Sequence, residues 1–469
     1  MKPSDLLRNI PSVSDLLESP PLKQLVDRVS HHVVVGGVRT FLDDMRREVQ
    51  KRAEDFSVPP IGELAERIAR KILHDEQHLL RPVINATGVI LHTGLGRAPL
   101  ADEAVEQLVA NSRDYCSLEF DLVDGERSRR MVAVEQLLTQ LTGAEAALVV
   151  NNNAAATLLA LTALAAGKKV VVSRGQLVEI GGSFRLPDVM SASGALLQEV
   201  GTTNKTHAAD YERAIDAETA VLMRVHTSNY RVVGFSSQVP IEQIVKIGQQ
   251  HQLVVVDDIG SGTLVDMNQY GFSDEPQASA SIAAGADIVL FSGDKLLGGP
   301  QCGVVVGRRE LVERMARHAM ARALRVGKLT LAALAATLRL YRDPAVAQRS
   351  IPLLQLLGTP TANLKSRAER LAPQMAAAAT VARAEAIEEV TYLGGGSVPT
   401  EQLPTWCVAL SPAKLSVSAF ARALRRATPA VVGRIRQDQL LLDLRAVFPR
   451  QDIELVAAVA GCTPASNPL

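Results

Sequence analysis

The chain has 469 residues, and its 50 basic and 50 acidic side chains give a formal net charge of zero. This balance excludes a protein that binds nucleic acids through bulk charge, and it leaves only local basic surfaces for such a role. The length predicts about two to four domains, and a hydrophobic content of 47% supports a large core.

The four cysteines lie far apart and none forms a CxxC pair, which argues against a disulfide framework or a zinc knuckle and favours a reducing cytoplasm. The N-terminus lacks the apolar core of a signal peptide, and no run reaches the ~18 apolar residues of a membrane helix. No spacing of histidines and carboxylates in the segments below predicts a metal site. We therefore expect a cytoplasmic protein without a metal.

Residues 1–80 predict a small helical module, because apolar residues recur there at helical spacing. The segment Ser12–Asp15 has the pattern of a capping box. The pairs Gly36-Gly37 and Pro59-Pro60 are expected to break the helices. Acidic and basic residues are nearly balanced, so the module is not a simple basic arm.

Residues 81–335 predict a large α/β domain, in which short β-branched runs alternate with helical stretches. This alternation favours a mostly parallel sheet with helices on both faces, whose ligands bind beyond the carboxyl ends of the strands. A long helix is expected from Arg309 to about Tyr341. The expected strands are 146–150, 169–173, 220–225, 253–256, 288–291 and 304–306, with helices at 154–166 and 241–250.

Residues 336–469 predict a smaller α/β domain. The segments that indicate it are 364–379, a turn at 394–396, a strand at 406–410, and 417–427, 439–443 and 453–459.

Lys295 lies between two of the expected strands, in Ser292-Gly-Asp-Lys-Leu-Leu-Gly-Gly-Pro300. Packing explains this position poorly, because burying an unpaired ammonium is costly. A lysine held in a closed site is well suited to form a Schiff base, because its pKa falls readily on burial. A surface lysine in a β-hairpin is the alternative, and this segment alone does not decide between the two.

The segment Asn151-Asn152-Asn153-Ala154 follows the expected strand 146–150 and begins a helix. Backbone N–H groups at a helix start bind anions such as phosphate, and the three asparagines add side-chain donors. An ordinary Asn-rich helix cap would explain the same residues.

A buried strand ends in Asp257 and Asp258, followed by a Gly-Ser-Gly turn. An acid at this point could pair with a protonated ring nitrogen or a metal, or could cap a helix or turn. Strand alternation puts the two carboxylates on opposite faces, so only one of them can serve a given site.

The order of the phosphate-binding turn, the acid and the lysine resembles the aspartate-aminotransferase-like class of pyridoxal-phosphate enzymes. Further segments extend the likeness to the bacterial selenocysteine synthase family, the L-seryl-tRNA(Sec) selenium transferases, over essentially the full length. These segments are Asn85–Pro99, Arg174–Arg185, Glu199–Lys205, His226–Tyr230, Asp258–Gly262 and Ser292–Pro300.

The resemblance implies a pyridoxal 5'-phosphate enzyme of fold type I that converts L-seryl-tRNA(Sec) to L-selenocysteinyl-tRNA(Sec) with selenophosphate. Lys295 would carry the cofactor, and Asp258 would keep the ring nitrogen protonated, which makes the ring an electron sink. Asp258 is preferred to Asp257 because Asp-x-Gly resembles related enzymes. The seryl amino group would displace Lys295 to form an external aldimine, and Lys295 would then remove the Cα proton. Loss of the hydroxyl would give an aminoacrylyl-tRNA that accepts selenium.

The resemblance also assigns further residues. Asn151, Asn152, Asn153 and Ala154 would bind the cofactor, and His226 would contact cofactor or substrate unless it is a structural histidine. The family arginines for selenophosphate correspond to Arg97, Arg322 and Arg325. A shared face is expected for Arg322 and Arg325, which are one helical turn apart. The loop residues Glu179, Ser183 and Arg185 have the right order to cover the cofactor.

The family binds its tRNA partly through the N-terminal module and assembles as a decamer. The near-neutral module is a mild caution, because phosphate contacts require Lys and Arg. Its candidates are Lys23, Arg28, Arg46, Arg47, Lys51, Arg52, Arg67, Arg70 and Lys71.

Two other hypotheses use the same residues. A pyridoxal-phosphate lyase or desulfurase for a free small amino acid needs the turn, the acid and the lysine but no tRNA module. A non-catalytic RNA-binding or assembly protein could retain the fold without the cofactor.

Overall fold

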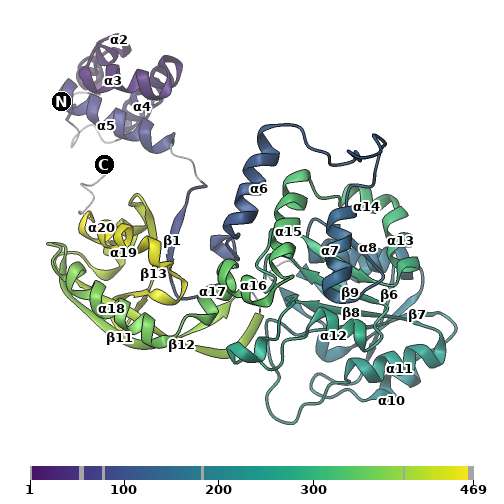
Figure 1. Ribbon diagram of the computed structural model, residues 1–469. Coiled ribbons are helices and arrows are strands. Elements are labelled where there is room, and N and C mark those ends of the chain that lie inside the picture. The colour runs from purple at the N-terminus through teal and green to yellow at the C-terminus, as the bar shows by residue number, and fades with distance from the viewer. Residues whose placement is uncertain (1–2, 52–56, 77–79, 181–183, 395–396, 463–469) are drawn as a thin grey trace. The chain divides into compact units, whose positions relative to one another are not determined.

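The structure is a computed structural model that describes residues 3–51, 57–76, 80–180, 184–394 and 397–462. It forms two compact units, Met1–Pro82 and Val83–Leu469 (Figure 1). None of the described helices combines the length and the apolar character that a membrane crossing requires.

The first unit is helical, as predicted. Ser12 Oγ accepts a hydrogen bond from the Asp15 N–H at 3.2 Å, and the Asp15 carboxylate accepts one from the Ser12 N–H, which confirms the capping box. The predicted break at Gly36-Gly37 is wrong, because one helix runs through both glycines. A Cβ at Gly37 would overlap Ile72, so glycine here permits close helix packing. The helices are α1 (Pro3–Arg8), α2 (Val13–Leu17), α3 (Pro20–Val29), α4 (His31–Lys51) and α5 (Ile61–Asp75).

The second unit contains a seven-stranded sheet in the order β2-β10-β9-β8-β7-β3-β6. Only β10 runs antiparallel to its neighbours, which confirms a mostly parallel sheet. The strands are β2 (Ala146–Val150), β3 (Lys169–Ser173), β6 (Leu196–Val200), β7 (Thr219–Val225), β8 (Val254–Gly260), β9 (Ile288–Ser292) and β10 (Gly303–Gly307).

Helices cover both faces of this sheet, so it has a separate apolar core on each side (Figure 1). One face carries α8 (Asn153–Ala165), α9 (Leu186–Ser193) and α13 (Arg309–Arg317). The other carries α7 (Val132–Thr142), α10 (Ala208–Ala214), α11 (Ile241–His251), α12 (Ala278–Ala283) and α15 (Lys328–Leu340), with α6 (Asp102–Arg113) packed on α15. A short hairpin is formed by β4 (Glu179–Ile180) and β5 (Phe184–Arg185).

The predicted long helix from Arg309 to Tyr341 is wrong, because the segment forms three helices. His318 has an extended backbone and its Nδ1 caps α14 (Ala319–Ala323) by accepting from the Met320 N–H. Gly327 is also extended and precedes α15. The apolar residues keep their helical spacing across both breaks, which is why a single helix was predicted. The capping residue His318 separates α13 from α14, and Gly327 separates α14 from α15.

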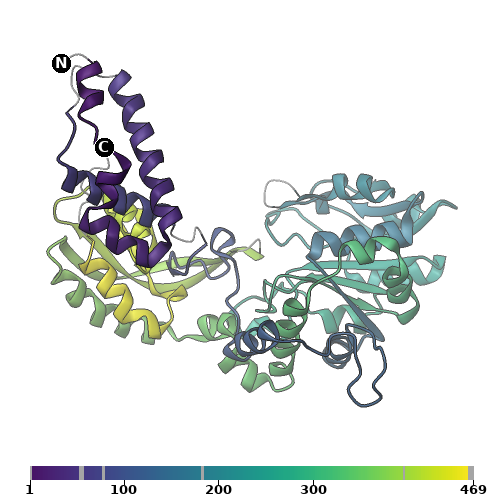
Figure 2. The same ribbon diagram turned by 90° about the horizontal axis from the view of Figure 1, so that it is seen from above.

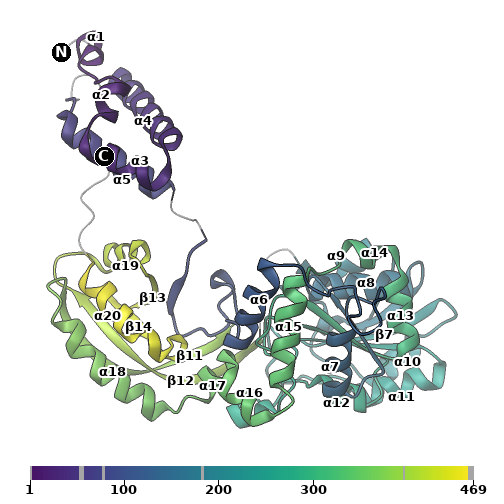
Figure 3. The same ribbon diagram turned by 45° about the horizontal axis from the view of Figure 1, so that its top comes forward.

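A second sheet has the order β1-β13-β14-β12-β11 and is antiparallel except for the β1–β13 pair (Figure 2). Helices α18, α19 and α20 share one apolar core with it (Figure 3). The predicted division near residue 335 stays a prediction. The elements are β1 (Val83–Ala86), α16 (Pro344–Ser350), α17 (Pro352–Gly358), α18 (Thr361–Ala376), β11 (Val381–Gly394), β12 (Ser397–Pro412), α19 (Val417–Arg426), β13 (Ala430–Arg436), β14 (Gln439–Asp443) and α20 (Asp452–Ala460).

Candidate active site

The asparagine turn joins β2 to α8 at the carboxyl end of β2. Asn152 caps α8 by accepting a hydrogen bond from the Ala155 N–H at 2.8 Å. The first backbone N–H groups of a helix have no carbonyl partner within it, and those of Asn153 and Ala154 belong to this group. Asn151 is tied by its N–H to the Leu324 carbonyl at 3.0 Å. Asn152 thus caps the helix, while the N–H groups of Asn153 and Ala154 remain free to bind an anion.

Asp258 points from β8 toward this turn. Its carboxylate accepts hydrogen bonds from Asn153 Nδ2 at 2.8 Å, Thr157 Oγ1 at 2.9 Å and the Gly260 N–H at 3.1 Å. Burial raises the pKa of Asp258, while these hydrogen bonds and the charge of Lys295 act in the opposite direction. A buried carboxylate in this state is stabilised by any cation placed beside it.

Asp257 has a different environment. Its two oxygens accept hydrogen bonds from Arg224 Nε and Nη2 at 2.7 and 2.6 Å, and its side chain is fully buried. This bidentate pair links β8 to β7 and leaves Asp257 no free oxygen edge for a ligand. Asp257 is therefore neutralised by the guanidinium of Arg224, whereas Asp258 accepts hydrogen bonds from neutral groups only.

Lys295 lies in the connection between the antiparallel strands β9 and β10, and it is only 5% exposed. It is thus not a surface lysine of a hairpin. Burial lowers the pKa of Lys295, and the charge of Arg97 adds to the decrease, while Asp258, Asp294 and Glu275 oppose it. Among the described residues, no hydrogen bond or ion pair holds its Nζ. An amine in this state is available as a nucleophile or base.

Arg97 lies beside the lysine. Its Nη1 donates to Asp294 Oδ2 at 2.7 Å, and the Ala98 N–H donates to the Asp294 carbonyl. Arg97 adopts a positive φ of 62°, and its buried Nε has no partner among the described residues. The backbone conformation and the ion pair together fix this arginine next to Lys295.

The other two predicted arginines do not share a helical face. Arg322 is exposed in α14, whereas Arg325 follows the end of that helix. Arg325 forms a β-bridge with Val150, and its Nη1 lies 3.6 Å from Glu119 Oε1. The break in the predicted long helix therefore brings Arg325 to the end of β2, next to the asparagine turn.

His226 follows β7, and its N–H donates to the Asp258 carbonyl at 2.8 Å. Its Nε2 lies 3.6 Å from Glu275 Oε1, and the Glu275 side chain is 3% exposed. Ser261 Oγ donates to Glu275 Oε2 at 2.5 Å. A cavity of about 400 Å³ is lined by His226 and Glu275, among other residues.

Sequence reasoning missed Glu275. It lies in the loop Asp274-Glu275-Pro276, where an acid before a proline has the appearance of an ordinary turn. Only the fold brings this carboxylate to Ser261 and His226. Of the loop residues expected over the cofactor, Arg185 pairs with Glu179 at 3.3 Å, and Ser183 lies outside the described residues.

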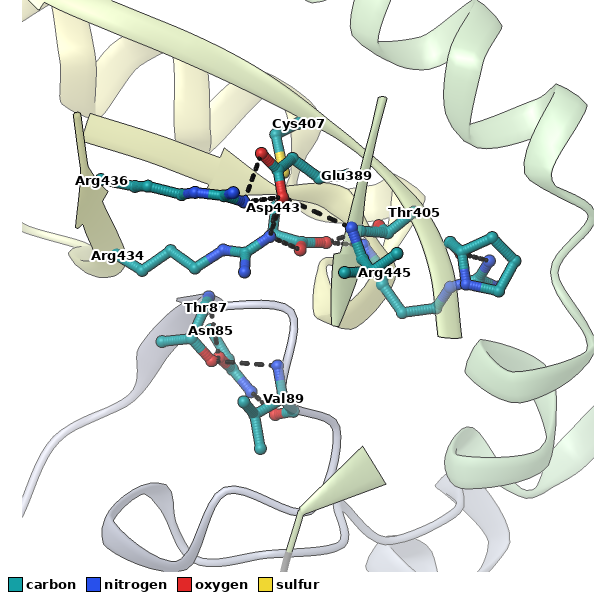
Figure 4. A network of polar contacts seen from close by, with 12 residues as sticks. Asn85, Thr87, Val89, Glu389, Thr405, Cys407, Arg434, Arg436, Asp443 and Arg445 are labelled. Atoms are coloured by element: carbon teal, nitrogen blue, oxygen red, sulfur yellow. Dashed lines mark hydrogen bonds and ion pairs between the residues drawn. The ribbon is translucent and has the colours of Figure 1, made fainter. Parts of the chain in front are cut away.

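The first part of the Asn85–Pro99 segment lies at the second sheet (Figure 4). Asn85 and Thr87 hold a turn through side-chain hydrogen bonds, including Asn85 Nδ2 to the Val89 carbonyl at 2.9 Å. Gly88 has a φ of 85°, and a Cβ there would overlap the buried carboxylate of Asp443. The polar residues of this part therefore have a structural explanation.

Comparisons with known proteins give consistent results. The family model described as L-seryl-tRNA selenium transferase matches residues 83–448, and one described as selenocysteine synthase N terminal matches residues 7–46. A Moorella thermoacetica protein named L-seryl-tRNA(Sec) selenium transferase is 47% identical over 98% of this chain and 97% of its own. A Geobacter sulfurreducens protein of the same name is 44% identical over 97% and 98%.

Among solved structures, a D-glucosaminate-6-phosphate ammonia-lyase is similar, with a TM-score of 0.55 and 21% identity over 86% of this chain and 98% of that one. At this identity the likeness shows a shared fold, which confirms the predicted α/β fold class.

Proposed function

Because the chain belongs to the L-seryl-tRNA selenium transferase family, we propose that it converts L-seryl-tRNA(Sec) to L-selenocysteinyl-tRNA(Sec) with selenophosphate as selenium donor. The observation that carries the proposal is the buried amine of Lys295, which lies at the carboxyl ends of the strands near Asp258 and has no hydrogen-bond or ion-pair partner among the described residues. Selenium transfer to a seryl group requires removal of a weakly acidic Cα proton, and such an amine suits that step.

The site fits pyridoxal 5'-phosphate. The start of α8, Asn151–Ala154, would hold the phosphate, and Asp258 would face the ring nitrogen. The buried Oδ1 of Asn153 has no donor among the described residues, which leaves an acceptor for a bound group. Lys295 would carry the cofactor, and His226 would lie beside it. When bound, the cofactor supplies an electron sink for charge that develops at the substrate Cα.

The side chains then have separate tasks. Burial lowers the pKa of Lys295 and so favours its neutral amine, which would accept the Cα proton of the seryl group. Asp258 supplies the negative charge that favours a protonated ring nitrogen. Asp258 and Lys295 both lie at the carboxyl ends of strands, which is where parallel α/β sheets bind their ligands.

Arginines provide the site for the anionic selenium donor. Arg97 is fixed beside Lys295 by Asp294, and a guanidinium matches the geometry of a phosphate-like group. Arg322 forms no ion pair with the described residues, and the single ion pair of Arg325 is long at 3.6 Å. Both therefore keep donors for a bound anion.

The N-terminal module, residues 1–80, is proposed to bind the tRNA, and the enzyme to act as a homo-oligomer in the cytoplasm. Most of the module's predicted phosphate-binding residues already pair with acids: Lys23, Arg46, Arg47, Arg67 and Lys71. Within the described part, Arg28 and Arg70 form no ion pair. Arg8 and Arg39 are likewise exposed and form no ion pair with described residues, so the described part of the module keeps four free cations for phosphate contacts.

The test is conversion of seryl-tRNA(Sec) with selenophosphate by the full chain, its Lys295→Ala variant and a Lys168→Ala control. Lys168 is exposed and directly precedes β3, at the amino ends of the parallel strands and opposite to the site, so its variant should match the parent. Equal product from Lys295→Ala would overturn the mechanism.

A second arm of the test addresses the alternative hypotheses. Turnover of free serine or cysteine without tRNA would favour a lyase or desulfurase. A pure protein without a borohydride-sensitive visible absorbance band after incubation with the cofactor would favour a non-catalytic protein. Loss of selective tRNA(Sec) binding on deletion of residues 1–80 supports the proposed role of the module.

A further inference from the structure

Helix α19 (Val417–Arg426) lies in a part of the chain without acidic residues. Between Glu401 and Asp438 there is no Asp or Glu, whereas there are six basic residues: Lys414, Arg422, Arg425, Arg426, Arg434 and Arg436. The chain as a whole has equal numbers of both signs. Arg434 and Arg436 pair with Glu389 and Asp443, so the excess positive charge is concentrated at and around α19.

The two faces of α19 differ sharply. Val417, Phe420, Ala421 and Leu424 are buried in the core of the second sheet. Ser418, Arg422 and Arg426 are exposed and follow one another at helical spacing. Lys414, just before the helix, is also exposed. The apolar face fixes the helix, so the basic face is held outward.

The basic side chains of this face lack acidic partners. Within the described part of the chain, Lys414, Arg422 and Arg426 form no ion pair. The arginines of α13 provide a contrast, because Arg309 lies 3.8 Å from Glu135 and Arg317 lies 2.8 Å from Glu313. A solvated helix face normally interleaves the two signs, and α13 does so whereas α19 does not.

Helix stability explains only part of this pattern. Basic residues in a last helical turn interact favourably with the helix dipole, which accounts for Arg426. It does not account for Lys414, which lies before the helix start, where the dipole disfavours a cation. Arg422 and Arg426 are also like charges four residues apart, an arrangement that weakens a helix. The positions of Lys414 and Arg422 are thus not explained by a contribution to the stability of α19.

We propose that the basic face of α19 binds the phosphate backbone of the tRNA substrate. This proposal rests on the proposed function, in which an aminoacylated tRNA is the substrate. Arginine donors suit phosphate oxygens, and a row of unpaired cations on a rigid helix gives a contact that does not depend on base sequence. It adds a second contact region to the N-terminal module, where five basic residues are already paired with acids.

The same face does not suit a lipid surface. Helices that bind membranes place Trp, Phe or Leu against the acyl chains and flank them with basic residues. The apolar residues of α19, such as Phe420 and Leu424, are buried in the protein core. Its exposed side is polar throughout, so a charged, hydrated polymer is the better match.

The test compares tRNA(Sec) binding by the full chain and by an Arg422→Gln/Arg426→Gln variant over a range of salt concentrations. The logarithm of the association constant falls with the logarithm of the salt concentration, and each phosphate contact adds about 0.7–0.9 to the steepness of this fall. The double variant should therefore make the slope shallower by about 1.5. We expect a roughly tenfold weaker Kd, a higher KM for seryl-tRNA(Sec), and an unchanged KM for selenophosphate.

Two further variants serve as controls. Arg422→Lys/Arg426→Lys keeps both charges and should restore most of the salt slope. Arg314→Gln/Arg317→Gln on α13 removes the same charge elsewhere and should leave tRNA binding unchanged. Thermal unfolding of each variant identifies any loss of fold, and the single variants Arg422→Gln and Arg426→Gln replace the double variant if it unfolds.

An unchanged Kd and salt slope in a folded double variant would overturn the inference. So would unchanged tRNA binding combined with arginine-dependent binding to anionic phospholipid vesicles. Turnover by the unsubstituted chain is measured in parallel. Its absence would count against the proposed function, whereas turnover with unaltered binding by the variant counts only against the α19 surface.

Discussion

Two adjacent carboxylates on β8 should respond in opposite ways to the same substitution. Asp257→Asn removes the charge that compensates Arg224, whose guanidinium now forms two hydrogen bonds to it at 2.7 and 2.6 Å. Breaking a buried ion pair from one side costs about 3–5 kcal/mol. Arg224 keeps 19% of its side chain exposed, and asparagine keeps one acceptor, so we expect about 2–3 kcal/mol.

Asp258→Asn should change stability much less. Burial already disfavours the charged form of Asp258 and raises its pKa, so a neutral side chain of the same shape removes that desolvation cost. The loss of one well-oriented acceptor for Asn153 or Thr157 offsets this gain, and the net change should stay within about 1 kcal/mol. Selenium transfer should fall by at least about 100-fold, because the negative charge at the proposed cofactor nitrogen is gone.

The assay combines thermal unfolding of the cofactor-free variants with turnover per folded molecule. We expect the unfolding midpoint of Asp257→Asn to fall by roughly 2–4 °C while its turnover near room temperature stays close to that of the parent. Asp258→Asn should show the reverse. A stable, inactive Asp257→Asn variant together with an active Asp258→Asn variant would exchange the two assignments and refute the reasoning.

Three further predictions concern the surroundings of the lysine. Asp294→Asn should raise KM for selenophosphate about tenfold with a smaller effect on kcat, because Arg97 loses the carboxylate that positions it; an unchanged KM would contradict this. Glu275→Gln should lower kcat, and a His226→Gln background should abolish that effect if Glu275 acts through the imidazole, as a double-mutant cycle can measure. Burial lowers the pKa of Lys295 and unfolding restores it, so the unfolded chain binds more protons between the two values. Stability of the cofactor-free protein should therefore rise with pH across that window, as denaturant midpoints would show, and Lys295→Met should lack this rise.

Six of the seven strands of the large sheet could be predicted from sequence because they are buried on both faces, whereas the partly exposed edge strand β6 was not expected. Strands buried on both faces are continuous β-branched runs, and the ends of β8 and β9 fall within a few residues of their expected positions. The three polar segments after β2, β8 and β9 could be found for the same reason. In parallel sheets, polar residues at strand ends have few packing roles that compete with a site.

Other features depended on contacts between distant segments. Glycine was expected to break α4, but at Gly37 the missing side chain makes room for Ile72 of α5. Glu275 gains its position only through Ser261 and His226, which precede it on other strand ends. Neither contact leaves a local pattern, because each depends on where a second element is placed by the fold.

The Asn85–Pro99 segment combines both situations. At one end, Gly88 fits against the buried Asp443, whose carboxylate also accepts from Thr405 at 2.6 Å and Arg434 at 3.0 Å (Figure 4). At the other end, Arg97 is held by Asp294 beside Lys295. Because both ends are fixed, the segment couples the packing of the second sheet to the position of the arginine proposed to bind selenophosphate. Packing against the second sheet therefore explains Gly88, and the proposed binding of selenophosphate explains Arg97. The sequence alone does not separate these two causes, because both residues lie in one continuous motif.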